Sequence, residues 1–400
     1  MLTIKLKKGR QKSLLRRHPW VFSGAIADTI GTPTPGDTVR IIDSDGEFLA
    51  WGAYSPSSQI RARVWSWDEA QTIDEEFFGH RIEEAIRIRE DLLPNEQTNA
   101  LRLVYAESDG LPGLIVDRYN DGVVMQVLSS GIERWLKIVS DLLVDITGAD
   151  WIYERSDVKV RQLEGLNLRK RVIRLRNTGS GSEYPWLVNI HENGLEFRVD
   201  VQEGQKTGFY LDQRRNRAYV GELSRGKQVL DCFSYTGGFT INALRGGAES
   251  ITAVDSSLEA LNQLEQNILL NKLPVERVDC RRGDVFQILR SFRDEGRSFD
   301  MVILDPPKFA PTRAQAERAA RGYKDINLLA MKLLRPQGLL TTFSCSGGID
   351  MELFQKIVAG AALDAGRDAK IIQRLHQDVD HPVALNFPES YYLKGIVVRV

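Results

Sequence analysis

The chain contains little cysteine, which argues against a fold held together by disulfides. Its 400 residues include three cysteines, Cys232, Cys280 and Cys345. An odd and sparse set of thiols does not form the framework of a small secreted domain, so a reducing, cytoplasmic setting is expected. Long apolar runs are also missing, and the basic start over residues 1–10 has no apolar signal core. We therefore expect a globular protein without membrane association.

An excess of charge of either sign is absent as well. The 53 basic and 54 acidic residues leave a net charge of −1, which excludes a protein that binds nucleic acid through its total charge. The basic residues are nevertheless clustered, and each cluster either tracks a phosphate backbone or is simply a solvated surface. The N-terminal cluster comprises Lys5, Lys7, Lys8, Arg10, Lys12, Arg16 and Arg17; the central cluster comprises Arg155, Lys159, Arg161, Arg169, Lys170, Arg171, Arg174 and Arg176.

The length of the chain predicts more than one domain. Short β-like runs separated by turns fill residues 1–72 and predict a small barrel. An amphipathic helix over 73–93 then leads into a second β-rich unit, which ends at a Gly- and Ser-rich linker over 177–185. From residue 186 onward, strands alternate with helices, as in an α/β protein with a doubly wound parallel sheet.

Reactive side chains follow five of the strand-like runs in this last region. They are Asp231, Asp255, Asp284, Asp305 and Cys345. Because the carboxyl ends of parallel strands form the ligand crevice of such a sheet, these side chains are expected at one edge. The final two runs, 369–373 and 393–400, would complete a seven-stranded sheet. The predicted helices cover 238–245, 257–271, 285–293, 323–334 and 351–365.

The turn after the first of these strands predicts a nucleoside ligand without a pyrophosphate. It carries Gly237 and Gly238, which let backbone approach a ligand, but it lacks the G-x-G-x-x-G pattern. Asp255 stands where an acid binds ribose hydroxyls, and Asp284 could accept from an adenine amino group. Each acid alone is more often a cap or turn residue. Together with Asp231 they favour S-adenosylmethionine, a cationic nucleoside.

The segment Asp305-Pro-Pro-Lys-Phe309 predicts a rigid rim for a flat substrate. Pro306 and Pro307 fix the backbone directly after a buried strand, although they could also merely terminate it. Lys308 and an exposed Phe309 would then contact a base that has left its stack. We expect Asp305 to bind the edge of that base and to lie beside the cofactor.

Cys345 supplies a candidate nucleophile. Carbon 5 of cytosine or uracil is a poor nucleophile until a thiolate adds to carbon 6, and cysteine suits that addition. The alternative is a buried structural thiol, a common fate of free cysteines. Its position between Ser344 and Ser346, at the carboxyl edge of the predicted sheet, favours a catalytic role. Cys232 and Cys280 are interpreted as packing residues.

Eight stretches occur in a specific order along the whole chain: 17–24 (RHPWVFSG), 52–64, 107–113 (ESDGLPG), 206–214 (KTGFYLDQR), 232–239 (CFSYTGGF), 305–309 (DPPKF), 321–327 and 343–347 (FSCSG). This combination resembles the ribosomal RNA large subunit methyltransferase I family, which makes 5-methylcytosine in 23S rRNA. The resemblance implies a PUA-like RNA-binding domain over 1–72, a helical linker and central β-rich domain over 73–185, and a Rossmann-like methyltransferase domain over 186–400.

The resemblance also implies S-adenosylmethionine as methyl donor, no metal, and Cys345 as the nucleophile. It implies that the segment 206–214 closes over the donor. The implied partner is 23S rRNA or a partly assembled large ribosomal subunit, and a homodimer is left open. The second cysteine that many RNA cytosine-C5 methyltransferases carry beside the Asp305 motif is absent here. The donor-binding residues expected are Lys206, Thr207, Tyr210, Asp212, Arg214, Asp231, Phe233, Tyr235, Gly237, Asp255, Asp284 and Asp305.

Two other functions fit parts of the sequence. An RNA methyltransferase acting on the amino group of adenine N6 or guanine N2 would use a similar Asp-Pro-Pro motif but would not need Cys345. A non-catalytic RNA-binding assembly factor would use the N-terminal domain and would not need Asp231, Asp255 and Asp284 in register.

Overall fold

A computed structural model describes residues 1–92, 97–175, 186–309 and 316–400, and the chain divides into two compact units. Unit 1 comprises 1–191, 199–211 and 379–390; unit 2 comprises 192–198, 212–378 and 391–400. The expected linker over 177–185 and the last residue of the expected helix over 73–93 lie outside the described residues. The three predicted domain ranges stay predictions.

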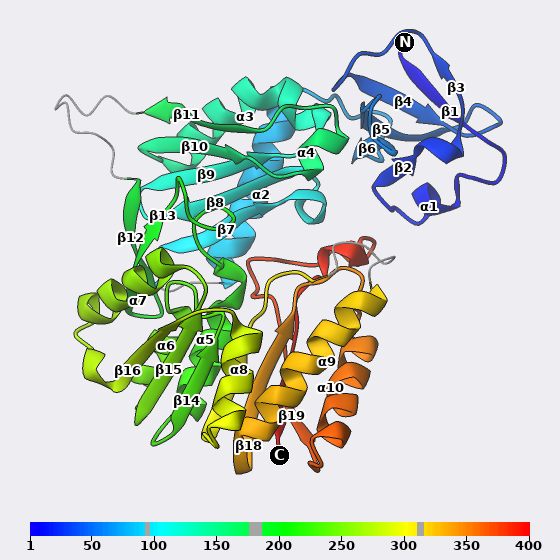
Figure 1. Ribbon diagram of the computed structural model, residues 1–400. Coiled ribbons are helices and arrows are strands. Elements are labelled where there is room, and N and C mark those ends of the chain that lie inside the picture. The colour runs from blue at the N-terminus through cyan, green and yellow to red at the C-terminus, as the bar shows by residue number, and fades with distance from the viewer. Residues whose placement is uncertain (93–96, 176–185, 310–315) are drawn as a thin grey trace. The chain divides into compact units, whose positions relative to one another are not determined.

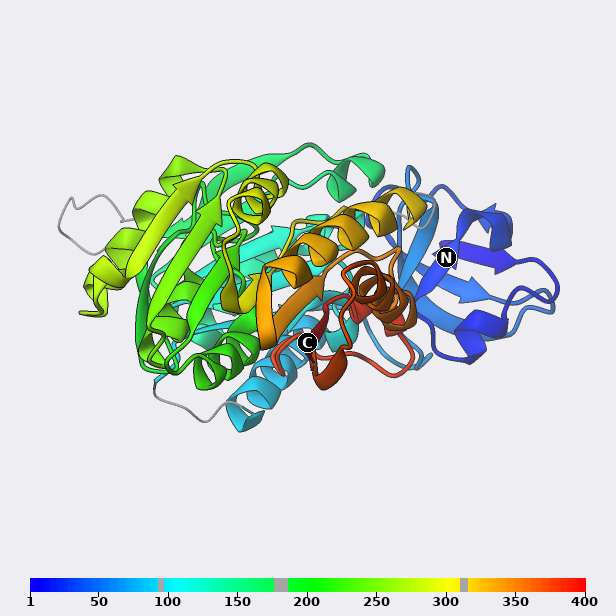
Figure 2. The same cartoon turned by 60° about the horizontal axis from the view of Figure 1, so that its bottom comes forward.

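Unit 1 begins with a six-stranded sheet, drawn in blue in Figure 2, in the order β2-β6-β5-β4-β1-β3. Alternating apolar residues such as Ile4, Val39 and Ile41 are fully buried and form its core. The elements are β1 (Thr3–Leu6), α1 (Lys12–Leu15), β2 (Trp20–Phe22), β3 (Ile26–Ile30), β4 (Thr38–Ile42), β5 (Phe48–Tyr54) and β6 (Ile60–Ser66).

A second, five-stranded sheet of unit 1 has the order β11-β10-β9-β8-β7, and α2 and α3 pack against each other and contact this sheet. Its core includes Phe78, Ile82, Val104, Val116 and Ile132, all fully buried. The elements are α2 (Glu75–Leu92), β7 (Ala100–Tyr105), η2 (Ala106–Asp109), β8 (Leu114–Tyr119), β9 (Gly122–Val127), α3 (Ser130–Thr147), β10 (Trp151–Ser156), α4 (Val160–Leu163) and β11 (Arg169–Leu175); β12 (Leu187–Glu192) and β13 (Leu195–Asp200) form a separate pair.

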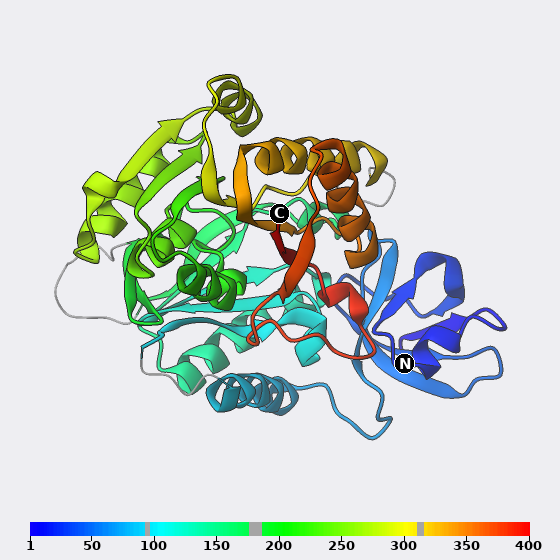
Figure 3. The ribbon, with the colours of Figure 1, turned by 90° about the horizontal axis from the view of Figure 1, so that it is seen from below.

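Unit 2 contains the predicted seven-stranded sheet, in the order β16-β15-β14-β17-β18-β20-β19. Strands β14 to β18 run parallel, and β20 is antiparallel to both of its neighbours, with the C-terminus beside it (Figure 3). This confirms that the final two strands complete a seven-stranded sheet. The strands are β14 (Gln228–Cys232), β15 (Ser250–Asp255), β16 (Val278–Arg282), β17 (Phe299–Leu304), β18 (Leu334–Ser344), β19 (Lys370–His376) and β20 (Lys394–Arg399).

The helices of unit 2 form two packed groups. Contacts link α5, α6 and α7 to one another, and α8, α9 and α10 lie side by side along the sheet in yellow to orange (Figure 1). Four predicted helices agree with the structure within about a residue at each end, but α9 begins seven residues before the predicted start at 323. The helices are α5 (Arg214–Leu223), α6 (Gly238–Arg245), α7 (Leu258–Leu270), α8 (Val285–Asp294), α9 (Ala316–Leu333) and α10 (Met351–Asp364).

A buried ion pair supports the turn that follows β14. Arg217 on α5 donates to both carboxylate oxygens of Glu192, at 2.8 and 2.5 Å, and both side chains are almost fully buried. The Arg217 side chain lies so close to Gly238 that a Cβ there would be 2.8 Å from its Cδ. The ion pair therefore fixes a side chain against which the start of α6 rests.

Replacing Glu192 by Gln should destabilise unit 2 by about 3–5 kcal/mol, because it leaves the buried guanidinium of Arg217 without its counter-charge. Urea unfolding monitored by circular dichroism measures this change. The matched control is Glu222→Gln, an exposed carboxylate on the same α5 helix that should change the free energy of unfolding by less than about 0.5 kcal/mol. Equal effects of the two substitutions would contradict the structural role of Glu192.

Candidate active site

The parallel register of the sheet brings the predicted site residues to one edge. Cys232 of β14 aligns with Val254 on one side and with Leu304 on the other, and Leu304 aligns with Thr342 of β18. Asp255, the last residue of β15, and Asp305 and Cys345, which directly follow β17 and β18, therefore lie at the carboxyl edge of the sheet. The sequence prediction of a common edge is confirmed for these strands.

The turn between β14 and α6 has an unusual backbone. Phe233 and Tyr235 both have positive φ, 63° and 48°, which is costly for residues other than glycine. Gly237 has φ 89°, and a Cβ there would meet Leu264 at 2.6 Å, so glycine is required. A strained turn at a strand end, held by its surroundings, is typical of a ligand-binding segment.

Asp231 is the least solvated carboxylate of the group. It is fully buried, and its Oδ2 accepts a hydrogen bond from Thr240 at 2.7 Å. Its Oδ1 has no hydrogen-bond partner among the described residues. Burial raises the pKa of Asp231 to about 7, with the nearby Asp305 carboxylate adding to the rise. An unpaired buried oxygen can be satisfied by a proton or by a cationic ligand.

Asp255 and Asp284 occupy different environments. Asp255 is half-buried and accepts from the backbone N–H groups of Tyr235 and Ser257, both at 2.9 Å, so it also orders the strained turn. Asp284 is exposed and caps α8 by accepting from the N–H of Gln287 at 3.0 Å. Both carboxylates keep lone pairs for a ligand hydroxyl or amine, and their donor contacts stay predictions.

The predicted lid segment over 206–214 belongs partly to each unit. In unit 1, Lys206 is exposed with its ammonium over the Tyr210 ring, and Thr207 is buried with its hydroxyl donating to Asp117 at 2.6 Å. In unit 2, Asp212 accepts from the phenol of Tyr392. Arg214 forms a buried ion pair of 2.8 Å with Asp378. The side chains of Thr207 and Arg214 thus make structural bonds, and the closure of this segment over a donor stays a prediction.

The segment after β17 forms part of a packed rim. Asp305 accepts from the side-chain amide of Gln213 at 3.0 Å. Pro306 is buried, whereas Pro307 and Lys308 are exposed. Phe309 is not the exposed ring expected from the sequence: it is half-buried and packs on Tyr323, with ring centroids 4.7 Å apart.

Cys345 directly follows β18 and is partly accessible, between Ser344 and Ser346, which are fully buried. The carbonyl of Ser346 accepts from the ammonium of Lys394 at 2.8 Å, and its hydroxyl lies 3.0 Å from the phenol of Tyr323. The negative charge of a Cys345 thiolate acts on both Lys394 and Tyr323 and contributes a rise to the pKa of each. The thiol therefore sits in a loop fixed by two buried polar side chains.

Lys394 is an ionisable side chain in a buried position. It is 3% exposed, and burial lowers the pKa of its ammonium to about 8, with the positive charge of Lys308 also lowering it. It was not singled out from the sequence. The only signal was its place at the start of the last predicted strand, which gives no indication that β20 pairs Lys394 with Ser344. Tyr323 and Gln213 lie in the quoted stretches 321–327 and 206–214 but were not named individually.

The other two cysteines are unsuited to nucleophilic chemistry. Burial raises the pKa of Cys232 well above its ordinary value, and that of Cys280 to about 11. Cys232 is fully buried within β14.

In the part of the chain that the structure describes, no group of three or more His, Cys, Asp or Glu side chains could hold a metal ion. No helix there is long and apolar enough to cross a membrane.

The two basic clusters have different environments. In the central cluster, Arg161 pairs with Glu133 at 2.7 Å and Arg171 with Glu154 at 2.8 Å, so much of its charge is neutralised internally. In the N-terminal cluster, no side chain forms an ion pair with any residue in the described ranges, and most of them are exposed. Among the described residues, the N-terminal cluster therefore presents more free positive charge to an anionic partner than the central cluster does.

Comparison with known families defines the class of the protein. A PUA-like domain model matches residues 4–67, and a model of S-adenosylmethionine-dependent methyltransferases matches residues 169–379. A solved structure from Streptococcus mutans, assigned to the SAM-dependent methyltransferases, superposes with a TM-score of 0.84 at 20% identity, covering 100% of both chains. A related structure with the same scores holds SAH. The chain is an S-adenosylmethionine-dependent methyltransferase with a PUA-like domain.

Curated relatives narrow this class. Proteins named ribosomal RNA large subunit methyltransferase I from Tolumonas auensis and Aeromonas salmonicida are each 52% identical, over 99% of this chain and 99% and 98% of their own. The one from Escherichia coli O157:H7 is 48% identical over 99% of this chain. The chain belongs to the ribosomal RNA large subunit methyltransferase I family, as its motifs predicted.

The raised pKa of Asp231 predicts how stability depends on pH. The folded state binds a proton up to about pH 7, whereas the unfolded chain releases it near 3.8. Stability contributed by Asp231 is therefore present below pH 3.8 and is lost as pH rises to about 7. The isosteric Asp231→Asn should remove this loss, so its advantage over the wild type in urea unfolding should grow between pH 4 and 7, by at most about 1.4 kcal/mol per pH unit.

The control for this measurement is Asp284→Asn, which preserves the cap of α8 and lies on the surface. Its unfolding profile should run parallel to that of the wild type. A parallel profile for Asp231→Asn as well would show that Asp231 is ionised throughout this range.

Proposed function

We propose that this protein methylates carbon 5 of a cytosine in the RNA of the large ribosomal subunit, through a covalent bond between Cys345 and carbon 6 of the base. The observation that carries the proposal is the one accessible, electrostatically supported thiol at the carboxyl edge of the methyltransferase sheet. The names of the curated relatives support rRNA as the substrate.

S-Adenosylmethionine, when bound, supplies an electrophilic methyl group next to a cationic sulfur. The residues present fit this group. Oδ1 of Asp231, which has no hydrogen-bond partner among the described residues, can accept from the ammonium of the methionine part of the donor. The half-buried Asp255 can accept from its ribose hydroxyls. The absence of a phosphate agrees with a turn that uses Gly237 for close approach and has no pyrophosphate cradle. Asp284 at the exposed end of β16 is available to an adenine amino group.

The chain's own residues would perform the chemistry on the base. The Cys345 thiolate adds to carbon 6 while Asp305, in its protonated form, donates its proton to N3 and accepts from the N4 amino group, so that the negative charge developing on the ring is neutralised; the N3 proton returns to Asp305 when the thiolate leaves. Carbon 5, made nucleophilic by this addition, accepts the methyl group. A base then removes the proton from carbon 5, and Cys345 leaves as a thiolate to restore the aromatic ring.

Lys394 would keep Cys345 deprotonated. Its ammonium is buried beside the Cys345 loop and bonded to the carbonyls of Ser346 and Tyr392, at 2.8 and 2.6 Å. A fixed positive charge in a poorly solvated site lowers the free energy of a nearby thiolate. Since the second cysteine that many RNA cytosine-C5 methyltransferases carry is absent here, the same ammonium is a candidate for stabilising the thiolate when the product leaves.

The covalent step predicts that Cys345→Ala lowers methylation of large-subunit rRNA by at least about 10³-fold, because no other group can activate carbon 5. The control Cys280→Ala should retain activity. Mass spectrometry after incubation with donor and a 5-fluorocytidine-substituted rRNA fragment should show an adduct on Cys345, since fluorine blocks the final elimination. Full activity of Cys345→Ala, with no adduct, would instead support methylation of an amino group.

The proposed charge on Lys394 predicts a change in thiol reactivity. Lys394→Met should slow alkylation of Cys345 by iodoacetamide about tenfold at pH 7, as expected for a thiol pKa raised by about one unit. The difference from the wild type should shrink above pH 8, where Lys394 itself loses its proton. Lys394→Arg, which keeps a positive charge, should retain the wild-type rate at pH 7. The readout is the rate of labelling at Cys345, followed by peptide mass spectrometry, and unchanged labelling in Lys394→Met would refute the role.

A further inference from the structure

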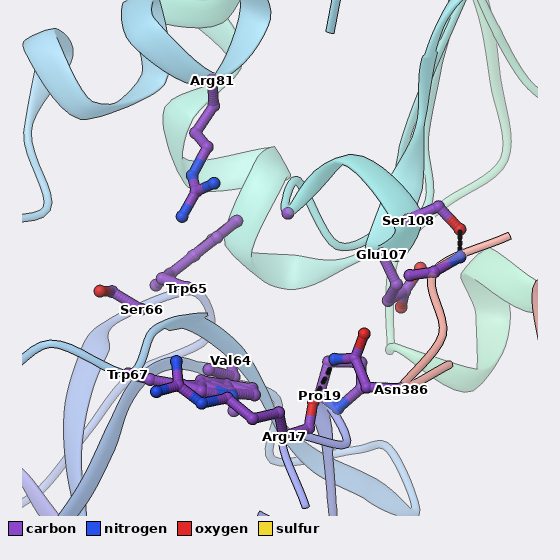
Figure 4. A pocket seen from close by; sticks show the side chains of 12 residues that line it. Arg17, Pro19, Val64, Trp65, Ser66, Trp67, Arg81, Glu107, Ser108 and Asn386 are labelled. Carbon is purple, nitrogen blue, oxygen red and sulfur yellow. Dashed lines mark hydrogen bonds between the residues drawn. The ribbon is translucent and has the colours of Figure 1, made fainter. Parts of the chain in front are cut away.

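Unit 1 contains a pocket that the proposed chemistry does not use. Its volume is about 260 Å³, close to the lower end of the roughly 300–1,000 Å³ of pockets that hold small ligands. Figure 4 shows its walls: Arg17 and Trp67 below, Trp65 and Arg81 above them, and Glu107 and Asn386 to one side. It gathers residues from the stretches 17–24, 52–64 and 107–113, which the methyltransferase reaction leaves unexplained.

Arg17 is held in an unfavourable conformation facing this pocket. Its φ is 63°, in the left-handed region that costs a non-glycine residue energy. The side-chain amide of Asn386 donates to its carbonyl, and its guanidinium lies over the ring of Trp67, 5.8 Å from the centroid (Figure 4). Arg17 forms no ion pair with any residue in the described ranges. The result is a flat cationic surface backed by an indole.

The side of the pocket offers a hydrogen-bond acceptor. Glu107 is nearly buried, and its Oε1 receives the indole N–H of Trp20 at 2.8 Å and lies 3.5 Å from the Arg63 guanidinium. Both contacts use Oε1, which leaves Oε2 to accept from a ligand amino or imino group. Arg81 pairs only loosely with Glu84, at 3.6 Å on the surface, so its guanidinium can meet a phosphate.

We propose that this pocket receives one unpaired nucleotide of the RNA substrate, with its base stacked on Arg17 and Trp67 and its edge bonded to Glu107. Unpaired bases are commonly recognised by stacking on aromatic rings and on arginine planes, with hydrogen bonds to the base edge. The phosphate of the same nucleotide pairs with Arg81. This inference rests on the proposed action on RNA, but not on which atom is methylated.

The composition of the pocket selects a nucleotide over simpler ligands. A free inorganic anion would be repelled by the Glu107 carboxylate, which lines the same small volume as Arg17 and Arg81. A paired base would have no face available for stacking, and a duplex could not enter so small a cavity. The exposed N-terminal basic cluster, which forms no ion pair with a described residue, would hold neighbouring phosphates of the strand without reading its sequence.

The test compares two adjacent arginines. Arg16 is exposed like Arg17 and carries the same charge, but it does not line the pocket. Affinity is measured by fluorescence anisotropy with a labelled ten-nucleotide single-stranded RNA of mixed sequence and with the blunt duplex of that sequence. Arg17→Ala should weaken single-strand binding roughly 5- to 20-fold, the range of one lost stacking contact, whereas Arg16→Ala should weaken it no more than about twofold. Both should affect the duplex equally and slightly.

A second variant controls for misfolding caused by the substitution at Arg17, whose backbone is strained. Trp67→Leu should weaken single-strand binding to a similar degree with an unchanged far-ultraviolet circular dichroism spectrum. The proposal is overturned if Arg17→Ala and Trp67→Leu match Arg16→Ala, or if they weaken the duplex as much as the single strand. The latter outcome would indicate a backbone contact without an inserted base.

Failure of this inference can be told apart from failure of the proposed function. With the unmethylated rRNA fragment as substrate, Arg17→Ala should raise KM about as much as it raises Kd and leave kcat unchanged. With the 5-fluorocytidine-substituted fragment, it should leave the trapped Cys345 adduct unchanged. An adduct without any effect of Arg17→Ala would retain the C5 chemistry and reject the pocket. A selective effect of Arg17→Ala with no adduct in the wild type would retain the pocket and reject the C5 chemistry.

Discussion

The parallel alignment of β14 with β15 and β17 is the constraint on which the candidate site depends. In an all-parallel arrangement each strand delivers its following loop to the same edge, so residues far apart in sequence meet without any long-range bonding between them. The alignment of Cys232 with Leu304 places the Asp305 loop beside the Phe233–Gly237 turn. The sheet, the hydrogen bond from Tyr235 to Asp255 and the packing of Gly237 on Leu264 together stabilise the strained backbone of this turn.

Two ionisable side chains near the carboxyl edge of the sheet have pKa values shifted against their usual charged forms. Asp231 tends to hold a proton and Lys394 tends to lose one, in both cases because burial removes water from the charged form. Such shifts cluster where a protein must bind a charged ligand or activate a nucleophile. Two buried arginines of unit 2 instead lie in ion pairs, Arg217 with Glu192 and Arg214 with Asp378. Groups with shifted pKa values are thus found where the ligand and the base are expected.

Local patterns in the sequence predicted much of unit 2 and little of its cross-strand chemistry. The bounds predicted for α6 and α10 agree with the structure to within a residue, and the acids at the ends of β14, β15 and β17 follow from strand-end rules. Lys394 could not be found this way, because its approach to Cys345 depends on β20 returning antiparallel beside β18. The packing of Phe309 on Tyr323 is likewise a tertiary contact that overrides the exposure expected for a loop aromatic.

The central basic cluster shows why charge counts mislead in this chain. Arg161 is fully buried and bonded to Glu133, so charges that look like a phosphate track in the sequence stabilise the fold instead. Binding energy for RNA must then come from elsewhere in unit 1, where the N-terminal cluster is free and Arg17 stacks on Trp67. Energy gained there is the same before and during methyl transfer, so it can offset the few kcal/mol needed to extrude a base but cannot itself speed the chemical step. In the proposed mechanism, rate enhancement arises at Cys345, Asp305 and Lys394, where charge changes as the reaction proceeds.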